Sequence, residues 1–228
     1  MVPPLMFMFC VVGILLQAAF ILVEHREKYL PAVLLKGCAS LVFVWIGYQG
    51  LQASPDPSFA KLVFWGLICG AVGDVLLNLR FLSKSHGQKI FLVGIAAFLA
   101  GHILYLSALI PLSNNLLLSV LIGVVVAAGL LIYIFKTMSV KIAFKIFGIF
   151  YLGAVIVMTA VAIGNLIALQ IPNRLLYALG AVLFTISDIV LIFNTFGGKT
   201  RYSMRIMNLS YYYIGQLLIA LSLFYAVS

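Results

Sequence analysis

Residues 116–135 form the stretch LLLSVLIGVVVAAGLLIYIF, which contains no charged side chain. A helix needs about 20 mostly apolar residues to cross the hydrocarbon core of a bilayer. The whole chain has the same character, because 65% of its 228 residues are hydrophobic, 8% are charged and the mean hydropathy is +1.23. Soluble domains are about half apolar and a quarter charged. The sequence therefore predicts a polytopic membrane protein and excludes a soluble globular enzyme.

Seven further apolar runs of similar length flank this stretch, separated by charged tracts or tracts containing Pro, Asn and Ser. The eight expected spans cover residues 4–23, 30–51, 60–80, 89–110, 115–135, 143–168, 174–196 and 206–227. All seven prolines lie at run ends or between runs, so we expect no broken helix. No basic segment precedes the first run, which favours a retained helix over a cleaved signal. The expected fold class is all-α, a single transmembrane domain of eight helices over residues 1–228.

The basic residues predict how the chain is oriented in the membrane. Eleven of the 14 Lys and Arg residues lie in the first, third, fifth and seventh connections: Arg26, Lys28, Arg80, Lys84, Lys89, Lys136, Lys141, Lys145, Lys199, Arg201 and Arg205. The opposite side has Lys61 and Arg174. Cytoplasmic loops are enriched in Lys and Arg. We therefore expect a multi-pass protein, of a bacterial inner membrane, with both termini extracytoplasmic. The net charge of +9 then reflects the orientation of the chain in a lipid bilayer and does not indicate nucleic-acid binding.

The chain also shows signs of an internal repeat with an offset of 114 residues. This offset aligns Asp74 with Asp188 and Gly101 with Gly215, and it matches AGHILYLSAL to IGQLLIALSL. Four helices in each half preserve the orientation of the chain. The halves, about 1–114 and 115–228, therefore predict two parallel four-helix repeats.

Two carboxylates fall inside the expected spans. Asp74 and Asp188 each lie in a helix that runs toward the basic side, about 9 to 12 Å before its end at 1.5 Å per residue. An ionisable group inside a span costs several kcal/mol unless it is paired or faces a wet cavity. The pair therefore predicts a polar pocket, with interhelical packing as the structural alternative.

Seven other polar residues are candidates to bind or orient a substrate: Lys36, Asn78, His102, Tyr105, Asn194, Tyr212 and Gln216. Each also has a structural interpretation. Lys36 could extend to the interface, His102 could pack as a neutral ring, and Tyr212 belongs to an aromatic tract that fits an interfacial belt.

The familiar catalytic motifs are absent from the sequence. It contains no GxSxG elbow, no HExxH and no GxxxxGK[ST] loop, and its three histidines are too far apart in depth for a zinc site. We expect neither a cofactor nor a metal. Two carboxyl groups in a low-dielectric site suit acid/base chemistry, because one can hold a proton while the other is ionised.

At these residues the sequence resembles the YhhN-like family of integral membrane proteins, the lysoplasmalogenase family. The similarity lies in LLKG (34–37), GDVLLNL (73–79), AGHILY (100–105), SDIVLIF (187–193) and YYYIGQLLIALS (211–222), in this order. The chain departs from the family pattern after Lys36, where Gly37 and Cys38 stand in place of an expected proline.

The resemblance implies hydrolysis of the vinyl ether bond of a lysoplasmalogen, a lysophospholipid, to a fatty aldehyde and glycerophosphoethanolamine or glycerophosphocholine. One aspartate would protonate the vinyl ether and the other would stabilise the cation. Lys36, with Arg80 as the alternative, would hold the phosphate. Two other functions stay open, a proton-coupled transporter of a small or lipidic solute and a lipid-binding sensor.

Overall fold

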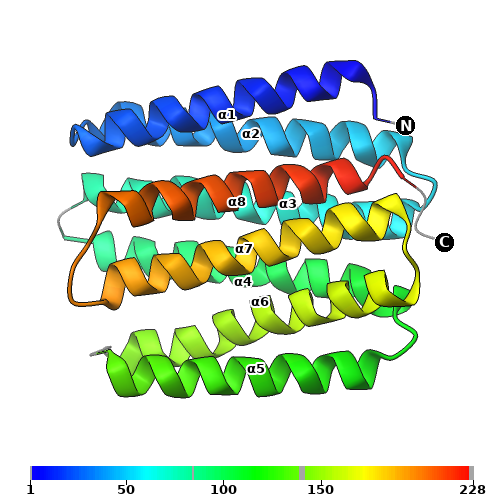
Figure 1. Ribbon diagram of the computed structural model, residues 1–228. Coiled ribbons are helices and arrows are strands. Elements are labelled where there is room, and N and C mark those ends of the chain that lie inside the picture. The colour runs from blue at the N-terminus through cyan, green and yellow to red at the C-terminus, as the bar shows by residue number, and fades with distance from the viewer. Residues whose placement is uncertain (1, 84, 139–141, 226–228) are drawn as a thin grey trace.

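The computed structural model describes residues 2–83, 85–138 and 142–225, and within them it contains eight α-helices and no strand (Figure 1). The helices are α1 (Pro4–His25), α2 (Tyr29–Ala53), α3 (Pro57–Leu79), α4 (Gly87–Leu109), α5 (Leu116–Thr137), α6 (Ile142–Ala168), α7 (Pro172–Phe196) and α8 (Tyr202–Ser222). Short 3₁₀ turns, η1 (Arg80–Leu82) and η2 (Ile110–Leu112), follow α3 and α4. Lys84 and Lys141, which contribute to the expected charge asymmetry, lie outside the described residues.

Seven of the helices, α1 to α7, are long and apolar enough to cross a membrane. The remaining helix, α8, does not reach the same apolarity, since its first half carries Arg205, Asn208 and several tyrosines. This helix packs against α1, α2, α3 and α7, and much of its length is buried. A helix enclosed by other helices contacts less lipid, which explains why α8 can be more polar than the rest.

The local sequence explains where the helices begin. Three of them start with a proline in the first turn, where its missing N–H costs nothing: Pro4, Pro57 and Pro172. Asp56 caps α3, because its side chain accepts hydrogen bonds from the backbone N–H groups of Ser58 (3.0 Å) and Phe59 (3.1 Å).

The bounds of α8 differ most from the sequence-based expectation of 206–227. The helix begins at Tyr202 because the backbone N–H of Arg201 donates to the side-chain oxygen of Asn194 at 2.7 Å, which closes the connection from α7 early. The helix ends at Ser222, where the N–H of Leu223 bonds back to Ala220. The expected end at 227 lies outside the described residues.

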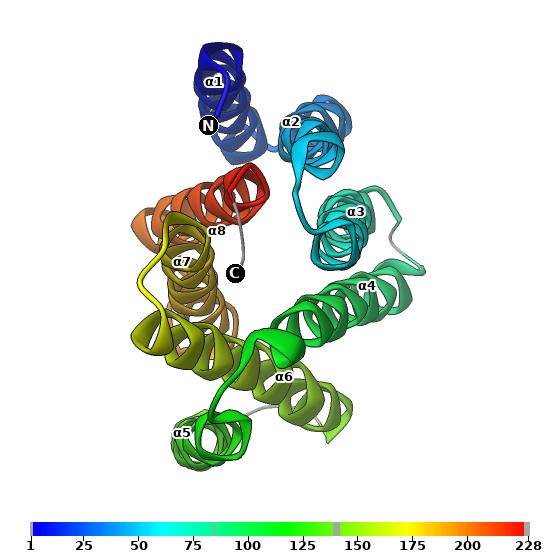
Figure 2. The same ribbon diagram turned by 90° about the vertical axis from the view of Figure 1, so that its right-hand side faces the viewer.

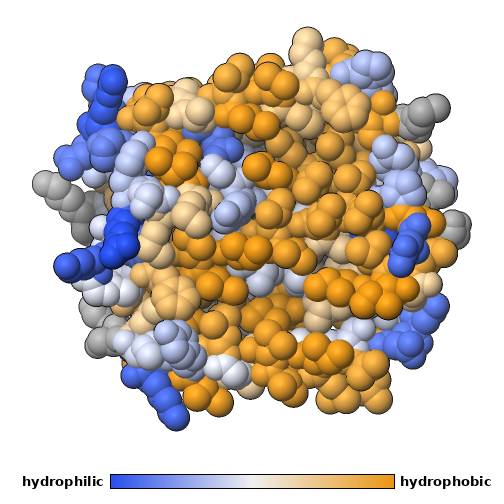
Figure 3. All heavy atoms as spheres, viewed as in Figure 1, coloured by the Kyte–Doolittle hydropathy of each residue, from blue (hydrophilic) through white to orange (hydrophobic). Residues whose placement is uncertain are grey.

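The helices surround a common interior. Viewed end-on, α2, α3, α4, α6, α7 and α8 enclose it, while α1 packs outside against α2 and α8, and α5 packs outside against α6 (Figure 2). Apolar side chains cover the middle of the molecule and hydrophilic residues gather at its two ends (Figure 3). This distribution matches the layered environment of a bilayer.

Two close helix crossings hold the helices that carry the aspartates. At the α3–α4 crossing, a Cβ atom added to Gly101 would lie 3.1 Å from the carbonyl oxygen of Gly66. At the α7–α8 crossing, a Cβ atom added to Gly215 would lie 2.8 Å from the carbonyl oxygen of Gly180. Small residues at such points let helix backbones approach closely. The glycines therefore fix α3 against α4 and α7 against α8.

Candidate active site

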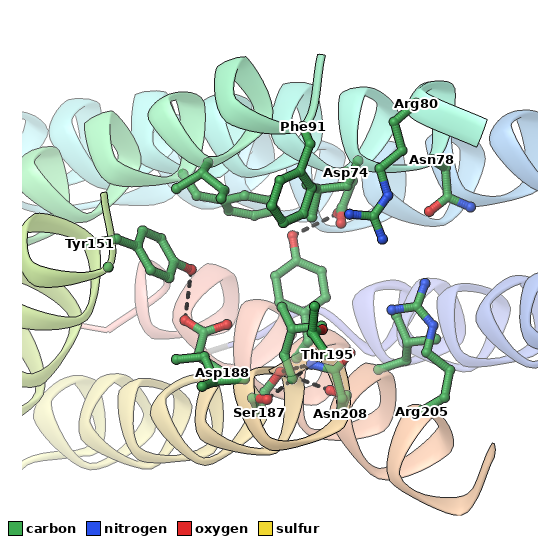
Figure 4. Close-up of a pocket in the computed structure, with 18 of the residues that line it drawn as sticks. Asp74, Asn78, Arg80, Phe91, Tyr151, Ser187, Asp188, Thr195, Arg205 and Asn208 are labelled. Atoms are coloured by element: carbon green, nitrogen blue, oxygen red, sulfur yellow. Dashed lines mark hydrogen bonds between the residues drawn. The ribbon is translucent and has the colours of Figure 1, made fainter. Parts of the chain in front are cut away.

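A pocket extends from the two intramembrane aspartates toward the basic end of the bundle (Figure 4). It is lined by α2, α3, η1, α4, α6, α7 and α8, and its empty space is about 970 Å³ including the open mouth. Six of the sequence-predicted residues line it: Lys36, Asp74, Asn78, Arg80, Asp188 and Tyr212.

Asp74 lies on α3 and accepts three polar contacts, one of them from a cation. The ammonium of Lys36 is 3.2 Å from its Oδ1 atom, and the hydroxyl groups of Ser40 and Tyr212 each lie 2.6 Å from its Oδ2 atom. All four side chains are buried. A charge-assisted contact with two short hydroxyl bonds is the environment of an ionised carboxylate.

Asp188 lies on α7 and has a different set of partners. The hydroxyl of Tyr151, on α6, donates a hydrogen bond of 2.7 Å to its Oδ2 atom (Figure 4). No cation forms an ion pair with Asp188 in the part of the chain that the structure describes. Ser187 beside it is bonded to Asn208, which ties α7 to α8 at this depth. Asp188 therefore has a neutral donor where Asp74 has a charged one.

A polar chain connects Asp74 to the basic end of the bundle. Lys36 donates to Asn78 at 3.4 Å, and Asn78 donates to Glu24 at 3.1 Å. Arg205 then binds both carboxylate oxygens of Glu24, at 2.9 and 2.7 Å. Lys36 is only 2% exposed. The structure therefore places Lys36 as the buried counter-ion of Asp74.

Tyr105 and Gln216 act on the pocket through Tyr212 and do not line it. The hydroxyl of Tyr105 donates to Gln216 at 2.9 Å, and the amide of Gln216 donates to the hydroxyl of Tyr212 at 3.4 Å. Gly70 leaves room for this chain, since a Cβ atom there would lie 2.6 Å from Nε2 of Gln216. The three polar groups thus orient the hydroxyl that Tyr212 directs at Asp74.

His102 and Asn194 are not among the residues that line the pocket. Both ring nitrogens of His102 are buried and lack a hydrogen-bond partner among the described residues. Its ring packs edge-on against Phe184 at 4.6 Å and Tyr151 at 5.5 Å between centroids, so it supports the wall beside Asp188. Asn194 instead closes the connection between α7 and α8.

A protein-family model matches most of the sequence. The model of the YhhN family matches residues 28–223, which covers most of the chain and includes both aspartates. The chain belongs to the YhhN family. Its many apolar helices and its membership of this membrane-protein family make it a multi-pass integral membrane protein.

Curated relatives of this YhhN-family chain are mammalian proteins named lysoplasmalogenase TMEM86B. The protein of Mus musculus is 31% identical over 80% of this chain and 69% of its own length. The protein of Sus scrofa is 32% identical over 68% of this chain and 60% of its own length. The protein of Homo sapiens is 28% identical over 86% of this chain and 73% of its own length. No solved structure gives a significant match.

Sequence reasoning did not identify Tyr151 and Arg205 as pocket residues of this YhhN-family chain. A tyrosine in an apolar helix has no distinguishing pattern, and Arg205 was interpreted as a topology signal. One signal could have identified Tyr151. The 114-residue offset places Phe150, its neighbour, opposite Lys36, so the repeat alone points to a partner for Asp188 on α6.

Proposed function

We propose that this chain is a lysoplasmalogenase-like hydrolase that cleaves the vinyl ether bond of a lysoplasmalogen. The observation that carries the proposal is the presence of two intramembrane carboxyl groups with unlike partners on one pocket. The names of the curated relatives support the substrate class. The products would be a fatty aldehyde and glycerophosphoethanolamine or glycerophosphocholine.

The different partners of the two aspartates suggest different roles. Asp74, which contacts Lys36, would be the ionised group that stabilises positive charge on the substrate. Asp188 has one neutral hydroxyl partner, and burial of a carboxyl group without a cation costs less free energy in the neutral form. Asp188 would therefore be the general acid.

The reaction needs one proton transfer to carbon and one water. Asp188 donates its proton to the vinyl carbon farther from the ether oxygen, which leaves an oxocarbenium ion on the carbon bonded to that oxygen. Carboxylates stabilise such ions in glycoside hydrolysis, and Asp74 would do so here. Water adds to the cationic carbon and its proton returns to Asp188. The resulting hemiacetal then separates into the aldehyde and the glycerol alcohol.

The rest of the pocket wall suits an apolar chain. Six phenylalanines line it: Phe91, Phe98, Phe144, Phe147, Phe184 and Phe196. Aromatic rings bury large apolar area and their faces attract cations. They would hold the alkenyl chain and favour the oxocarbenium ion.

The proposal extends to the placement of the protein in the membrane. We propose α8 as an eighth span, the basic end as cytoplasmic, and both termini as extracytoplasmic, in a bacterial inner membrane. We also propose that residues 1–114 and 115–228 are parallel repeats within one transmembrane domain. The glycine crossings support this, because Gly66 and Gly180, like Gly101 and Gly215, are 114 residues apart. Labelling of cysteines introduced at the termini from each side of the membrane tests the orientation.

Product analysis tests the proposed activity. Purified protein in detergent is incubated with an alkenyl lysophospholipid, and the expected result is one fatty aldehyde for each glycerophospho-alcohol. Acyl and alkyl lysophospholipids should not be cleaved, since no histidine lines the described pocket to activate Ser187 or Thr195 as an ester nucleophile, and an alkyl ether forms no stabilised cation. Plasmalogens with an acylated second position should react slowly, because a pocket between the helices has limited room for a second chain. Steady release of fatty acid from the acyl lipid, or no aldehyde from the alkenyl lipid, would overturn the proposal.

A further inference from the structure

Arg80 presents an unpaired cation to the pocket at its basic end. Its Nε atom is buried and has no hydrogen-bond partner among the described residues. Its guanidinium carbon lies 4.6 Å from the ring centre of Phe81 and 4.4 Å from that of Phe91. Aromatic faces hold an arginine by cation–π attraction and leave its N–H groups available. Arg80 is thus held in place without being neutralised.

The other two cations that line the pocket are already paired. Lys36 contacts Asp74, and Arg205 binds both oxygens of Glu24. In contrast, no carboxylate of the described residues forms an ion pair with Arg80. Arg80 is half-buried, and its buried Nε–H group costs free energy when it has no acceptor. Arg80 therefore faces the pocket without a carboxylate partner among the described residues, and the Arg205 guanidinium faces the same region (Figure 4).

The depth of Arg80 matches the geometry of a lysophospholipid. Arg80 follows Asp74 by six residues, which is about 9 Å along a helix axis at 1.5 Å per residue. In a lysoplasmalogen, six covalent bonds separate the ether-bonded vinyl carbon from phosphorus, and a zigzag of bonds of about 1.5 Å spans about 7 to 8 Å. A substrate with its vinyl ether beside the aspartates would place its phosphate at Arg80.

We infer that Arg80 binds the phosphodiester anion of the substrate headgroup, an inference that rests on the proposed vinyl ether hydrolysis. The planar guanidinium can donate two parallel hydrogen bonds to phosphate oxygens. Arg80 therefore takes the role that sequence reasoning gave first to Lys36. The site therefore recognises a single-chain lipid that carries a phosphodiester. Alkenylglycerol, which has no phosphate, should bind more weakly.

Paired substrates with and without phosphate test this subsite. Arg80→Gln and Arg80→Lys are compared with wild type on alkenyl glycerophosphoethanolamine and on alkenylglycerol. Arg80→Gln should raise KM for the phospholipid about 10- to 100-fold with little change in kcat, and Arg80→Lys should raise it by less. Neither substitution should change KM for alkenylglycerol. Arg26→Gln is the matched control, because Arg26 is exposed near the same end and does not line the pocket.

A binding measurement separates failure of the subsite from failure of the proposed activity. Alkyl glycerophosphoethanolamine and alkylglycerol, which resist cleavage, are tested as ligands of wild type and Arg80→Gln. If wild type binds the alkyl phospholipid more tightly than alkylglycerol, and Arg80→Gln binds the two ligands equally, the subsite is supported even if no lipid is hydrolysed. If Arg80→Gln raises the KM for both substrates equally and weakens the affinity for both ligands equally, the phosphate subsite is overturned and Arg80 is a structural residue. Equally effective competition by diacyl phosphatidylglycerol would overturn the substrate assignment in favour of a bilayer lipid.

Discussion

Asp74 and Asp188 lie 114 residues apart on α3 and α7, and both line the same pocket. Each aspartate is contacted by a side chain of the helix that precedes its own in the chain. The two contacting side chains differ in charge: α2 supplies the cation Lys36 to Asp74, and α6 supplies the neutral Tyr151 to Asp188. From α8, Tyr212 also donates to Asp74. Two similar frameworks thus hold two carboxyl groups in unlike electrostatic surroundings. The difference shows how one pocket could hold an acid and a counter-charge together.

The largest effects are expected from the aspartates themselves. Asp188→Asn and Asp74→Asn should each lower kcat by at least about 10²-fold, the loss typical of an acid/base group, while the protein stays extractable and monodisperse. The kcat of the double variant should be little lower than that of the less active single variant, because the two groups act as one unit. Steady-state assays on the alkenyl lysolipid provide the measurement.

Asp56→Asn is the matched control for these substitutions. Asp56 caps α3 outside the pocket, and asparagine caps helices equally well, so activity should be unchanged. Substantial turnover by either of the two pocket variants would return both aspartates to a packing role.

The ion pair predicts a difference in stability between the two sites. Lys36→Met leaves Asp74 buried without its cation and should destabilise the protein by about 3 to 5 kcal/mol. Combining it with Asp74→Asn should recover much of that loss, whereas combining it with Asp188→Asn should be additive. Thermal unfolding in detergent measures these changes. Equal coupling of Lys36 to both aspartates would remove the distinction between the sites.

The tyrosine hydroxyls should differ in importance. Tyr151→Phe removes the one hydrogen-bond donor that the described residues provide to Asp188 and should lower kcat about 10-fold. Tyr212→Phe leaves Asp74 with Lys36 and Ser40 and should lower kcat about 3-fold. The kcat values of the two variants are measured on the same substrate and compared, and Tyr151→Phe should have the lower value. A larger loss for Tyr212→Phe would reverse the proposed roles.

The smallest effect is expected behind Tyr212. Gly70→Ala adds a Cβ atom 2.6 Å from Nε2 of Gln216, so the amide must shift and activity should fall by roughly 2- to 5-fold, with the larger part of the effect on kcat. Gly129→Ala on α5, where nothing lies within 4 Å of the added atom, is the control and should be neutral. Identical activity in the two variants would show that the chain through Gln216 does not act on Asp74.

Hydropathy and charge were sufficient to predict the helices, since each expected run overlaps one observed helix. They also located Asp74 and Asp188, because carboxylates in apolar runs are conspicuous. Side-chain direction was not predictable in the same way. Gln216 and His102 have polarity and depth similar to pocket residues, but the rotation of α8 and α4 directs them to other neighbours.

The role of a cation could not be predicted from its position in the chain either. Lys36 and Arg80 both lie near the expected boundary, and only packing reveals that Lys36 is enclosed with Asp74 while Arg80 contacts two phenylalanine rings. Likewise, Arg205 is indistinguishable in sequence from a topology signal until Glu24 is seen beside it.

Infrared difference spectroscopy tests the contrast between the two carboxyl groups most directly. Spectra of wild type, Asp188→Asn and Asp74→Asn are recorded at neutral pH in lipid nanodiscs. Wild type should show the carbonyl stretch of a buried protonated carboxylic acid, Asp188→Asn should lose this band, and Asp74→Asn should retain it. Loss of the band in Asp74→Asn with retention in Asp188→Asn, or no such band in wild type, would contradict the assignment of Asp188 as the proton donor.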